Sequence, residues 1–220
     1  DLVVKSGLPS FIITLGSLFM IRGFTIAISK IITGRTQIGG IEESKGFNIM
    51  SSVFSNHLTI AGTNFPISIF WWMLFGVLGY FLLKHTQFGN WIFATGASQE
   101  SAKLMGIPVQ KVKISLFMLT AFCSWFIAVT QVTTFGGADV LRGEQKEFIA
   151  IIAVVIGGTL LTGGYGSIIG AMIGALIFGI VKQGIIFAGV DADWFQVFMG
   201  VMLVSAVLVN GAFRKKYAQG

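Results

Sequence analysis

The sequence predicts an all-α, polytopic membrane protein with about six transmembrane helices. Hydrophobic residues make up 54% of its 220 residues and charged residues only 11%, whereas soluble domains carry about a quarter charged residues. Six stretches approach the roughly 20 apolar residues that a helix needs to cross the hydrocarbon core with its backbone groups paired internally. The predicted spans are residues 8–29, 66–83, 114–134, 147–161, 167–186 and 194–209.

The prolines agree with these spans. Pro9 and Pro66 stand in the first turns of the first two spans, where a missing backbone N–H costs nothing. Pro108 lies between spans. No proline is left inside a predicted span, although the fourth span is short and flanked by glycines.

Basic residues predict the orientation. Eight Lys and Arg residues fall on the side that holds residues 88–113 and both chain ends, and five fall on the opposite side with seven of the nine acids. Lys and Arg accumulate on the cytoplasmic side of membrane proteins. We therefore expect residues 88–113 to form a cytoplasmic loop. Residues 30–65 are expected to form an irregular external segment with one surface helix near residues 49–54.

The central loop contains a short, well-delimited helix over residues 98–105. Ser98 is placed to cap it, and Glu100 puts a negative charge in its first turn. Gly106 can take the left-handed conformation just past its end, before Pro108 forbids continuation. A helix of this length is marginal alone in water, so we expect it to be braced against a partner.

Small residues recur every four positions on the fifth predicted span. Such rows let two helix backbones approach closely in lipid, and we prefer this packing role to a ligand role. No GxxxxGK[ST] motif accompanies the glycines, so nucleotide binding is not expected. The two rows contain Gly166, Gly170 and Gly174, and Ala171, Ala175 and Gly179.

Polar residues align on two other spans. Thr120, Ser124 and Gln131 share one face of the third span. Thr14, Ser17 and Thr25 nearly share one face of the first. Two interpretations stay open with equal weight. These side chains form hydrogen bonds between helices, or they line a pathway for an uncharged, hydroxyl-rich solute.

Titratable residues give little support for chemistry within the membrane. Arg22 and Lys182 are the cations inside spans, and we expect their long side chains to reach the outer interface. No Asp or Glu sits near the centre of a predicted span, which argues against an ion-coupled carrier. His57 and His85 have no partner at metal-ligand spacing and lie outside the spans. We therefore expect neither an enzyme nor a metal site. The basic residues are not interspersed with aromatic residues as in a nucleic-acid-binding groove, so we do not expect nucleic acid as a partner.

Three stretches resemble one protein family. GNWIFATGASQESAKLMGIPVQKVK (89–113) resembles the cytoplasmic coupling loop of permease subunits of bacterial ABC importers for monosaccharides such as ribose, xylose, galactose and fructose. Residues 151–194, with their GG…GG.GS..GA..GAL..G pattern, and LPSFIITLGSLFMIRG (8–23) resemble two further blocks of that family. Branched-chain amino-acid permeases share the glycine pattern more loosely.

The resemblance implies a multi-pass permease of the bacterial inner membrane with about ten spans in two inverted halves. This chain would be a fragment of its single permease domain, the C-terminal six spans, and about four spans would be missing. Its implied partners are lipid, a second permease copy, a cytoplasmic ABC ATPase dimer and an external sugar-binding protein. ATP and Mg would be bound in the ATPase, and this subunit would bind no cofactor.

The resemblance also implies roles for individual residues. The helix at residues 98–105 would be the coupling helix, entering an ATPase groove through Ala102, Leu104 and Met105. Transport would proceed by alternating access. Alternatives are a permease for branched-chain amino acids or another small solute, and a self-sufficient carrier or channel. The coupling residues are Ser98, Glu100, Ser101, Ala102, Leu104, Met105 and Gly106, and Arg142, Glu144 and Lys146 would contact the binding protein or form a solvated outer face.

Overall fold

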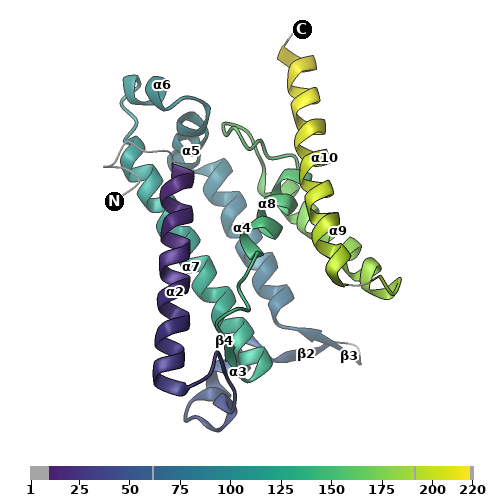
Figure 1. Cartoon of the computed structure of the whole chain (residues 1–220). Helices are drawn as coiled ribbons and strands as arrows, with labels where there is room; N and C mark the ends of the chain where they lie inside the picture. Colours follow the sequence, from purple (N-terminus) through teal and green to yellow (C-terminus); the bar gives the residue numbers. More distant parts are fainter. Residues whose placement is uncertain (1–9, 61, 191, 219–220) are drawn as a thin grey trace. The chain divides into compact units, whose positions relative to one another are not determined.

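The computed structural model describes residues 10–60, 62–190 and 192–218 and is mainly helical (Figure 1). The chain divides into two compact units. The first comprises Asp1–Met73 and Lys113–Glu144, and the second comprises Leu74–Val112 and Gln145–Gly220. Helices α4 (Ser68–His85) and α7 (Val109–Phe135) contribute to both units.

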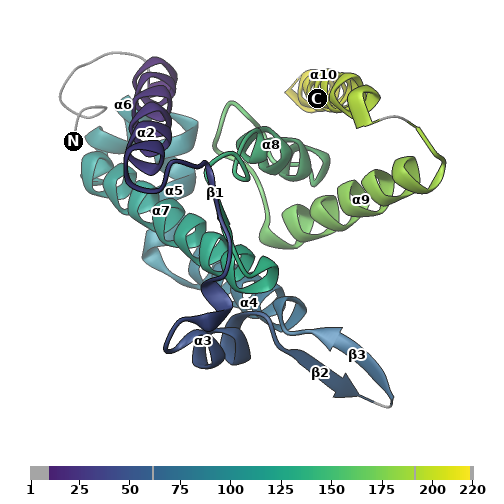
Figure 2. The same ribbon diagram turned by 60° about the horizontal axis from the view of Figure 1, so that its bottom comes forward.

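The first unit combines long helices with short strands. Strands β1 and β4 pair antiparallel, with Gln37 opposite Asp139, and β2 and β3 form a hairpin with His57 opposite Pro66. Figure 2 shows this hairpin extending beyond the start of α4. Besides the parts of α4 and α7, its elements are α2 (Ser10–Thr33), β1 (Gln37–Ile38), η1 (Ile41–Glu43), α3 (Phe47–Phe54), β2 (His57–Ile60), β3 (Thr63–Pro66) and β4 (Ala138–Asp139).

The segment predicted to be irregular is therefore more ordered than expected. The helix predicted near residues 49–54 is confirmed as α3, and an aromatic cluster fixes it. The Trp71 ring contacts the rings of Phe54 and Phe126, and its Nε1–H donates to the Val53 carbonyl at 2.9 Å. The two strand pairs were not predicted. Two- to four-residue strands carry too little alternation to be recognised in a sequence.

The second unit has its core where three helices meet. Buried Ile152 and Ala153 of α8, Phe178 of α9 and Met199 of α10 form one apolar cluster. Both views show α8 beside α9 and α10. Besides the parts of α4 and α7, the elements of this unit are α5 (Gln87–Ala97), α6 (Gln99–Leu104), α8 (Lys146–Ile156), α9 (Ile168–Phe187) and α10 (Ala192–Ala218).

Four described helices are long and apolar enough to cross a membrane. They are α2, α4, α7 and α9, each within a few residues of a predicted span. In α10 the described apolar stretch, Trp194–Ser205, is shorter than a span. The prediction of a span at residues 147–161 is wrong, since only the 11 residues of α8 are helical there. Eleven residues rise about 16 Å, whereas the hydrocarbon core is about 30 Å thick.

Glycine ends α8 early. Gly158 has φ +84°, and the Gly158 and Thr159 N–H groups donate to the Val155 and Val154 carbonyls at 2.9 and 3.2 Å. This pair of hydrogen bonds around a left-handed glycine is the Schellman motif, which closes a helix. Residues 157–167 then return as a loop to α9.

Candidate functional site

Helix α6 has the ends that the sequence predicts, although it is shorter, covering Gln99–Leu104. The Ser98 Oγ accepts a hydrogen bond from the Ser101 N–H at 3.3 Å. Gly106 has φ +79°, and the Gly106 and Ile107 N–H groups donate to the Lys103 and Ala102 carbonyls, both at 3.0 Å. Both helix ends are thus closed by specific hydrogen bonds, which stabilise a six-residue helix.

The side chains of α6 divide into a buried and an exposed set. Leu104 is 90% exposed and Met105 at the C-cap is 67% exposed, so the two form an apolar surface on a polar loop. Ala102 is fully buried. The prediction that Ala102 shares a docking face with Leu104 and Met105 is therefore wrong, because its side chain faces inward. Ser98, Glu100, Ser101 and Gly106 are exposed.

Helix α5, which the sequence analysis missed, connects α6 to the glycine-rich loop of the same unit. A Cβ added to Gly96 would lie 2.7 Å from the Gly164 nitrogen, and one added to Gly163 would lie 2.6 Å from the Gly96 oxygen. Both glycines of the loop have positive φ, as a tight turn requires. The backbone next to Ser98 thus lies directly against the turn between α8 and α9.

The small residues of α9 lie against α8 for part of their length. A Cβ on Gly174 would collide with the Ala153 carbonyl and lie 2.7 Å from the Gly157 nitrogen, and one on Gly170 would collide with the Gly157 carbonyl. Gly166 lies against the Thr159 side chain. Ala171 and Ala175 are half-buried, whereas Gly179 is exposed and would have nothing within 4 Å of an added Cβ. Gly179 therefore lies outside this contact.

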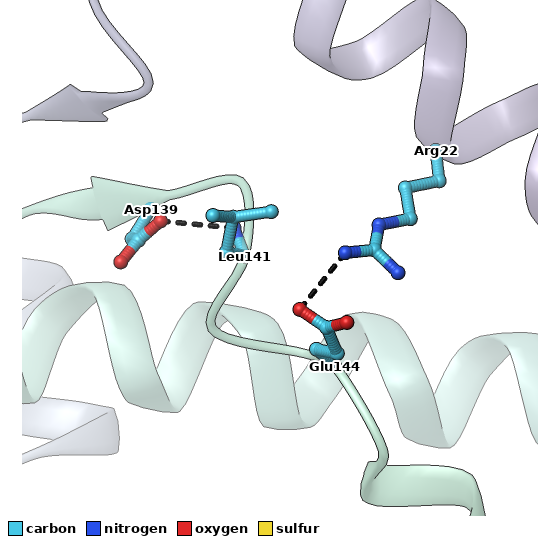
Figure 3. A network of polar contacts seen from close by, with 4 residues as sticks. All are labelled: Arg22, Asp139, Leu141 and Glu144. Carbon is cyan, nitrogen blue, oxygen red and sulfur yellow. Dashed lines mark hydrogen bonds and ion pairs between the residues drawn. The ribbon is translucent and has the colours of Figure 1, made fainter.

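Arg22 lies at the middle of α2, twelve positions after Ser10 and eleven before Thr33. One of its terminal nitrogens contacts a Glu144 carboxylate oxygen at 2.8 Å, as Figure 3 shows. Arg22 is held by this ion pair, and its reach to the outer interface stays a prediction. Glu144 itself belongs to the loop between β4 and α8 and to no predicted span.

The three residues proposed to contact a binding protein have different surroundings. Arg142 Nη1 donates to the Gly137 carbonyl at 2.8 Å, and its guanidinium carbon lies 4.5 Å from the centre of the Phe135 ring. Glu144 is paired with Arg22. Lys146 is exposed at the start of α8. Their role in contacting a binding protein stays a prediction.

The polar residues proposed to line a pathway bond mainly within their own helices. The Thr120 and Ser124 hydroxyls donate to the Leu116 and Thr120 carbonyls, both at 2.9 Å. The Ser17 hydroxyl donates to the Thr14 carbonyl at 2.9 Å, and Gln131 is half-buried. Lys182, the second cation within a span, has its amine 5.4 Å from the centre of the Phe195 ring. The two interpretations of the polar residues both remain predictions.

Asp139 organises the segment that leads from α7 to Glu144. Its carboxylate accepts hydrogen bonds from the Gln37 side chain and from the Leu141 N–H, both at 2.9 Å. These two bonds, with a smaller contribution from the nearby Arg142 charge, lower the pKa of Asp139 from its ordinary value of 3.8. Among the described residues, no three His, Cys, Asp or Glu side chains gather in a way that could hold a metal ion.

Comparison with known proteins decides the family. Residues 2–207 match the family described as the branched-chain amino acid transport system permease component. This chain belongs to that permease family. With four apolar helices of spanning length among its described residues and with bacterial relatives, it is a multi-pass protein of the bacterial inner membrane.

The permease resembles import permeases of several bacteria. It is 29% identical to the fructose import permease protein of Bifidobacterium longum over 96% of this chain and 61% of that protein. It is 29% identical to the ribose import permease protein of Escherichia coli K12, over 95% of this chain and 62% of that protein. The autoinducer 2 import system permease protein of Photorhabdus laumondii is 33% identical, over 94% of this chain and 60% of that protein. No solved structure matches.

These findings confirm the family-level resemblance. The chain spans about three fifths of the length of these curated relatives. The relatives are transport permeases by name, which agrees with the interpretation of this chain as a transport subunit. The roles of individual residues stay predictions.

Proposed function

We propose that this chain is the C-terminal part of the membrane-spanning subunit of an ATP-driven importer for a monosaccharide. Its relatives include import permeases named for ribose and fructose. We base the proposed substrate class of this chain on the substrates in those names. The full-length protein would have about ten spans, and this chain would contribute those after the fourth, with α8 as a half-length element among them.

The observation that carries the proposal is α6. Helix α6 has six residues and is capped at both ends. Leu104 and Met105 are exposed and give the polar loop a small apolar surface. We propose this pair of exposed apolar side chains as the site of contact with a protein partner. The excess of Lys and Arg on the same side supports a cytoplasmic position of the loop, where an ABC ATPase dimer would bind it. ATP and Mg would be bound by that partner.

The contacts within the second unit suggest how movement would pass through the permease. A push on α6 would act on the end of α5, whose Gly96 lies against the turn at Gly163 and Gly164. That turn joins α8 to α9, which share a close backbone contact at Gly157 and Gly174. Rigid contacts of this kind would convert ATPase closure into a shift of α8 and α9, as alternating access requires.

Transport from outside would also use a soluble sugar-binding protein and a second permease copy. On the proposed orientation, the β2–β3 hairpin and α3 belong to the external side. They are the surfaces we propose for the binding protein, with Arg142 and Lys146 as further candidates. Glu144 is a weaker candidate for this role because Arg22 already pairs with it.

The family description favours a second substrate class, the branched-chain amino acids. One experiment separates the two classes. The full-length permease is reconstituted in proteoliposomes with its ATPase and binding protein, and uptake of D-ribose, D-fructose and L-leucine is measured with and without ATP. ATP-dependent uptake of a sugar supports the proposal. Uptake of leucine alone supports the amino-acid function, and uptake without the ATPase supports a self-sufficient carrier or channel.

The docking role of α6 is tested in the same system. The double variant Leu104→Asp, Met105→Asp should insert in the membrane normally but lose co-purification with the ATPase and ATP-dependent uptake. Leu104→Met is the matched control, since it keeps an apolar side chain of similar volume and should retain both activities. Wild-type uptake by the double aspartate variant would overturn the assignment of α6.

A further inference from the structure

We propose that Arg22 and Glu144 together form a contact site for hydroxyl groups of the transported solute on the translocation pathway. The inference rests on the proposed function, because it assigns residues to the pathway of an importer. It concerns a pair that the sequence analysis did not bring together, since Arg22 was expected at the outer interface and Glu144 at an external surface.

The first step is the depth of the pair. Arg22 lies about 18 Å along the axis from the first residue of α2 and about 17 Å from the last, at a rise of 1.5 Å per residue. Charged side chains at such a depth are costly, and they face a bundle interior or a water-filled cavity and mark solute or ion pathways. Substrate sites of transporters commonly lie near the membrane midplane. With α2 as a membrane span, Arg22 stands near the middle of that span, where a solute site is expected.

The second step is the direction in which Arg22 points. Neighbouring positions of α2 carry large apolar side chains with wide exposure, 68% for Met20 and Phe24. The Arg22 side chain is only 35% exposed, on the side of the segment that holds Glu144. The apolar faces of α2 suit lipid or other helices. Arg22 occupies a polar face of its own.

Arg22 and Glu144 keep hydrogen-bond donors and acceptors that their mutual contact does not use. The contact joins one guanidinium nitrogen to one carboxylate oxygen, and within the described chain neither side chain makes another hydrogen bond or ion pair. A guanidinium carries five N–H donors, and a carboxylate accepts through both oxygens. With 35% and 44% of the two side chains exposed, donors and acceptors stand next to each other on an open face.

The fourth step is the match to a ligand. A hydroxyl group both donates and accepts, so one hydroxyl of a sugar can accept from the guanidinium while its neighbour donates to the carboxylate. Hydrogen bonds to charged groups are stronger than neutral ones. The opposite charges of the pair cancel, which suits an uncharged polyol better than an ion.

A purely structural role explains the pair less well. The segment from Gly136 to Glu144 is already held by the β1–β4 pairing and by the Val140 N–H, which donates to the Thr36 carbonyl at 3.2 Å. Its turn is closed by the Glu144 N–H, which donates to the Leu141 carbonyl at 3.0 Å. The backbone thus positions Glu144 without help from Arg22.

The test uses thiol labelling in the full-length permease reconstituted with its partners. Cys123 and the cysteines of the remaining chain are replaced by serine, and Glu144→Cys, Arg22→Cys and Ile21→Cys are introduced singly. A charged, membrane-impermeant methanethiosulfonate reagent reacts with the thiolate, which forms in water and not in hydrocarbon. Ile21→Cys is the matched control, because it lies at the same depth on an apolar face with 66% exposure.

The expected result is that the Glu144→Cys and Arg22→Cys thiols react several-fold faster than the Ile21→Cys thiol. Saturating D-ribose or D-fructose, whichever the wild type imports, should slow both reactions. Equal rates at the three positions, or rates unaffected by the imported sugar, would overturn the proposal. If the wild type imports neither sugar, the proposed function fails, and the relative labelling rates still decide whether the pair faces water.

Conservative variants cover the case in which the cysteine variants do not assemble. Arg22→Lys and Glu144→Asp keep both charges but move the donors and acceptors. A contact site predicts normal assembly with a several-fold change in the ratio of D-ribose to D-fructose uptake. A structural ion pair predicts an unchanged ratio, and that outcome would contradict the proposal.

Discussion

The α8–α9 contact and the Arg22–Glu144 pair show two different ways of joining segments in a membrane protein. In the first, Gly157, Gly170 and Gly174 bring two backbones together where no Cβ has room. In the second, two half-exposed charged side chains reach across from α2 to a loop. The contact between the glycines leaves no room for an added side chain. The ion pair is open, so it can exchange its partner for a ligand.

The largest effect on stability is expected from a bulky side chain at the α8–α9 contact. Gly174→Leu would force a side chain into the Ala153 carbonyl and separate α8 from α9. Overpacking of this kind costs about 1–3 kcal/mol or more. Thermal unfolding in detergent should show a clear loss of stability. Gly179→Leu is the control and should unfold like the wild type, because nothing lies within 4 Å there; equal losses in both variants would contradict the packing assignment.

At the glycine just past the end of α6, the effect of backbone conformation can be measured apart from that of steric space. Gly106 has φ +79° but no atom within 4 Å of an added Cβ, so substitution is opposed by backbone strain alone. Gly106→Val should cost about 1–2 kcal/mol and loosen the end of α6. The expected outcome is normal membrane insertion with reduced stimulation of the partner ATPase.

Gly106→Asn is the matched control for that variant. Asparagine tolerates the left-handed conformation better than valine does. It should therefore retain most of the ATPase stimulation. Similar activity in the Gly106→Val and Gly106→Asn variants would show that the helix end does not depend on this conformation.

The open pair should contribute less to stability than the α8–α9 contact. Partly exposed ion pairs are worth about 1 kcal/mol or less. We expect Arg22→Leu and Glu144→Leu each to lower the thermal stability slightly by leaving one charge unpaired. The double variant Arg22→Leu, Glu144→Leu should recover much of that loss in a double-mutant cycle. Strictly additive losses would mean that the two side chains do not interact in the folded protein.

The smallest expected effect concerns pH at the β1–β4 pairing. The pKa of Asp139 is lowered by the Gln37 and Leu141 hydrogen bonds, so its ionised form is stabilised in the folded state. This contribution is present above the unfolded pKa and is lost as the pH falls through the folded value. Amide exchange at Gln37 and Ile38 should therefore quicken, after correction for intrinsic rates, when the pH is lowered from neutral to below 3.8.

The variant Asp139→Asn serves as the control for the pH effect. It removes the titrating group, so its corrected exchange rates should change less with pH than those of the wild type. An equal pH response in the two proteins would assign the effect to another group.

Helix ends and packing faces could be predicted from the sequence where they depend on residues close together in the chain. The ends of α6 follow from Ser98 and Gly106, which act on their own helix within a few residues. Gly170 and Gly174 indicate close packing because their spacing puts them on one helix face. The predicted span at residues 147–161 failed for a related reason. Its apolar composition continued past Ile156, and the left-handed Gly158 ended the helix before the apolar stretch did.

By itself, the sequence determined that this chain is a helical, multi-pass membrane protein, which short helix its central loop holds, and to which family it is similar. These properties depend on composition, capping and spacing, which act between neighbouring residues. Only the tertiary structure decided that Ala102 faces inward and that Arg22 meets Glu144. Those two charges are more than a hundred positions apart, and only the turn after β4 brings the carboxylate to the middle of α2.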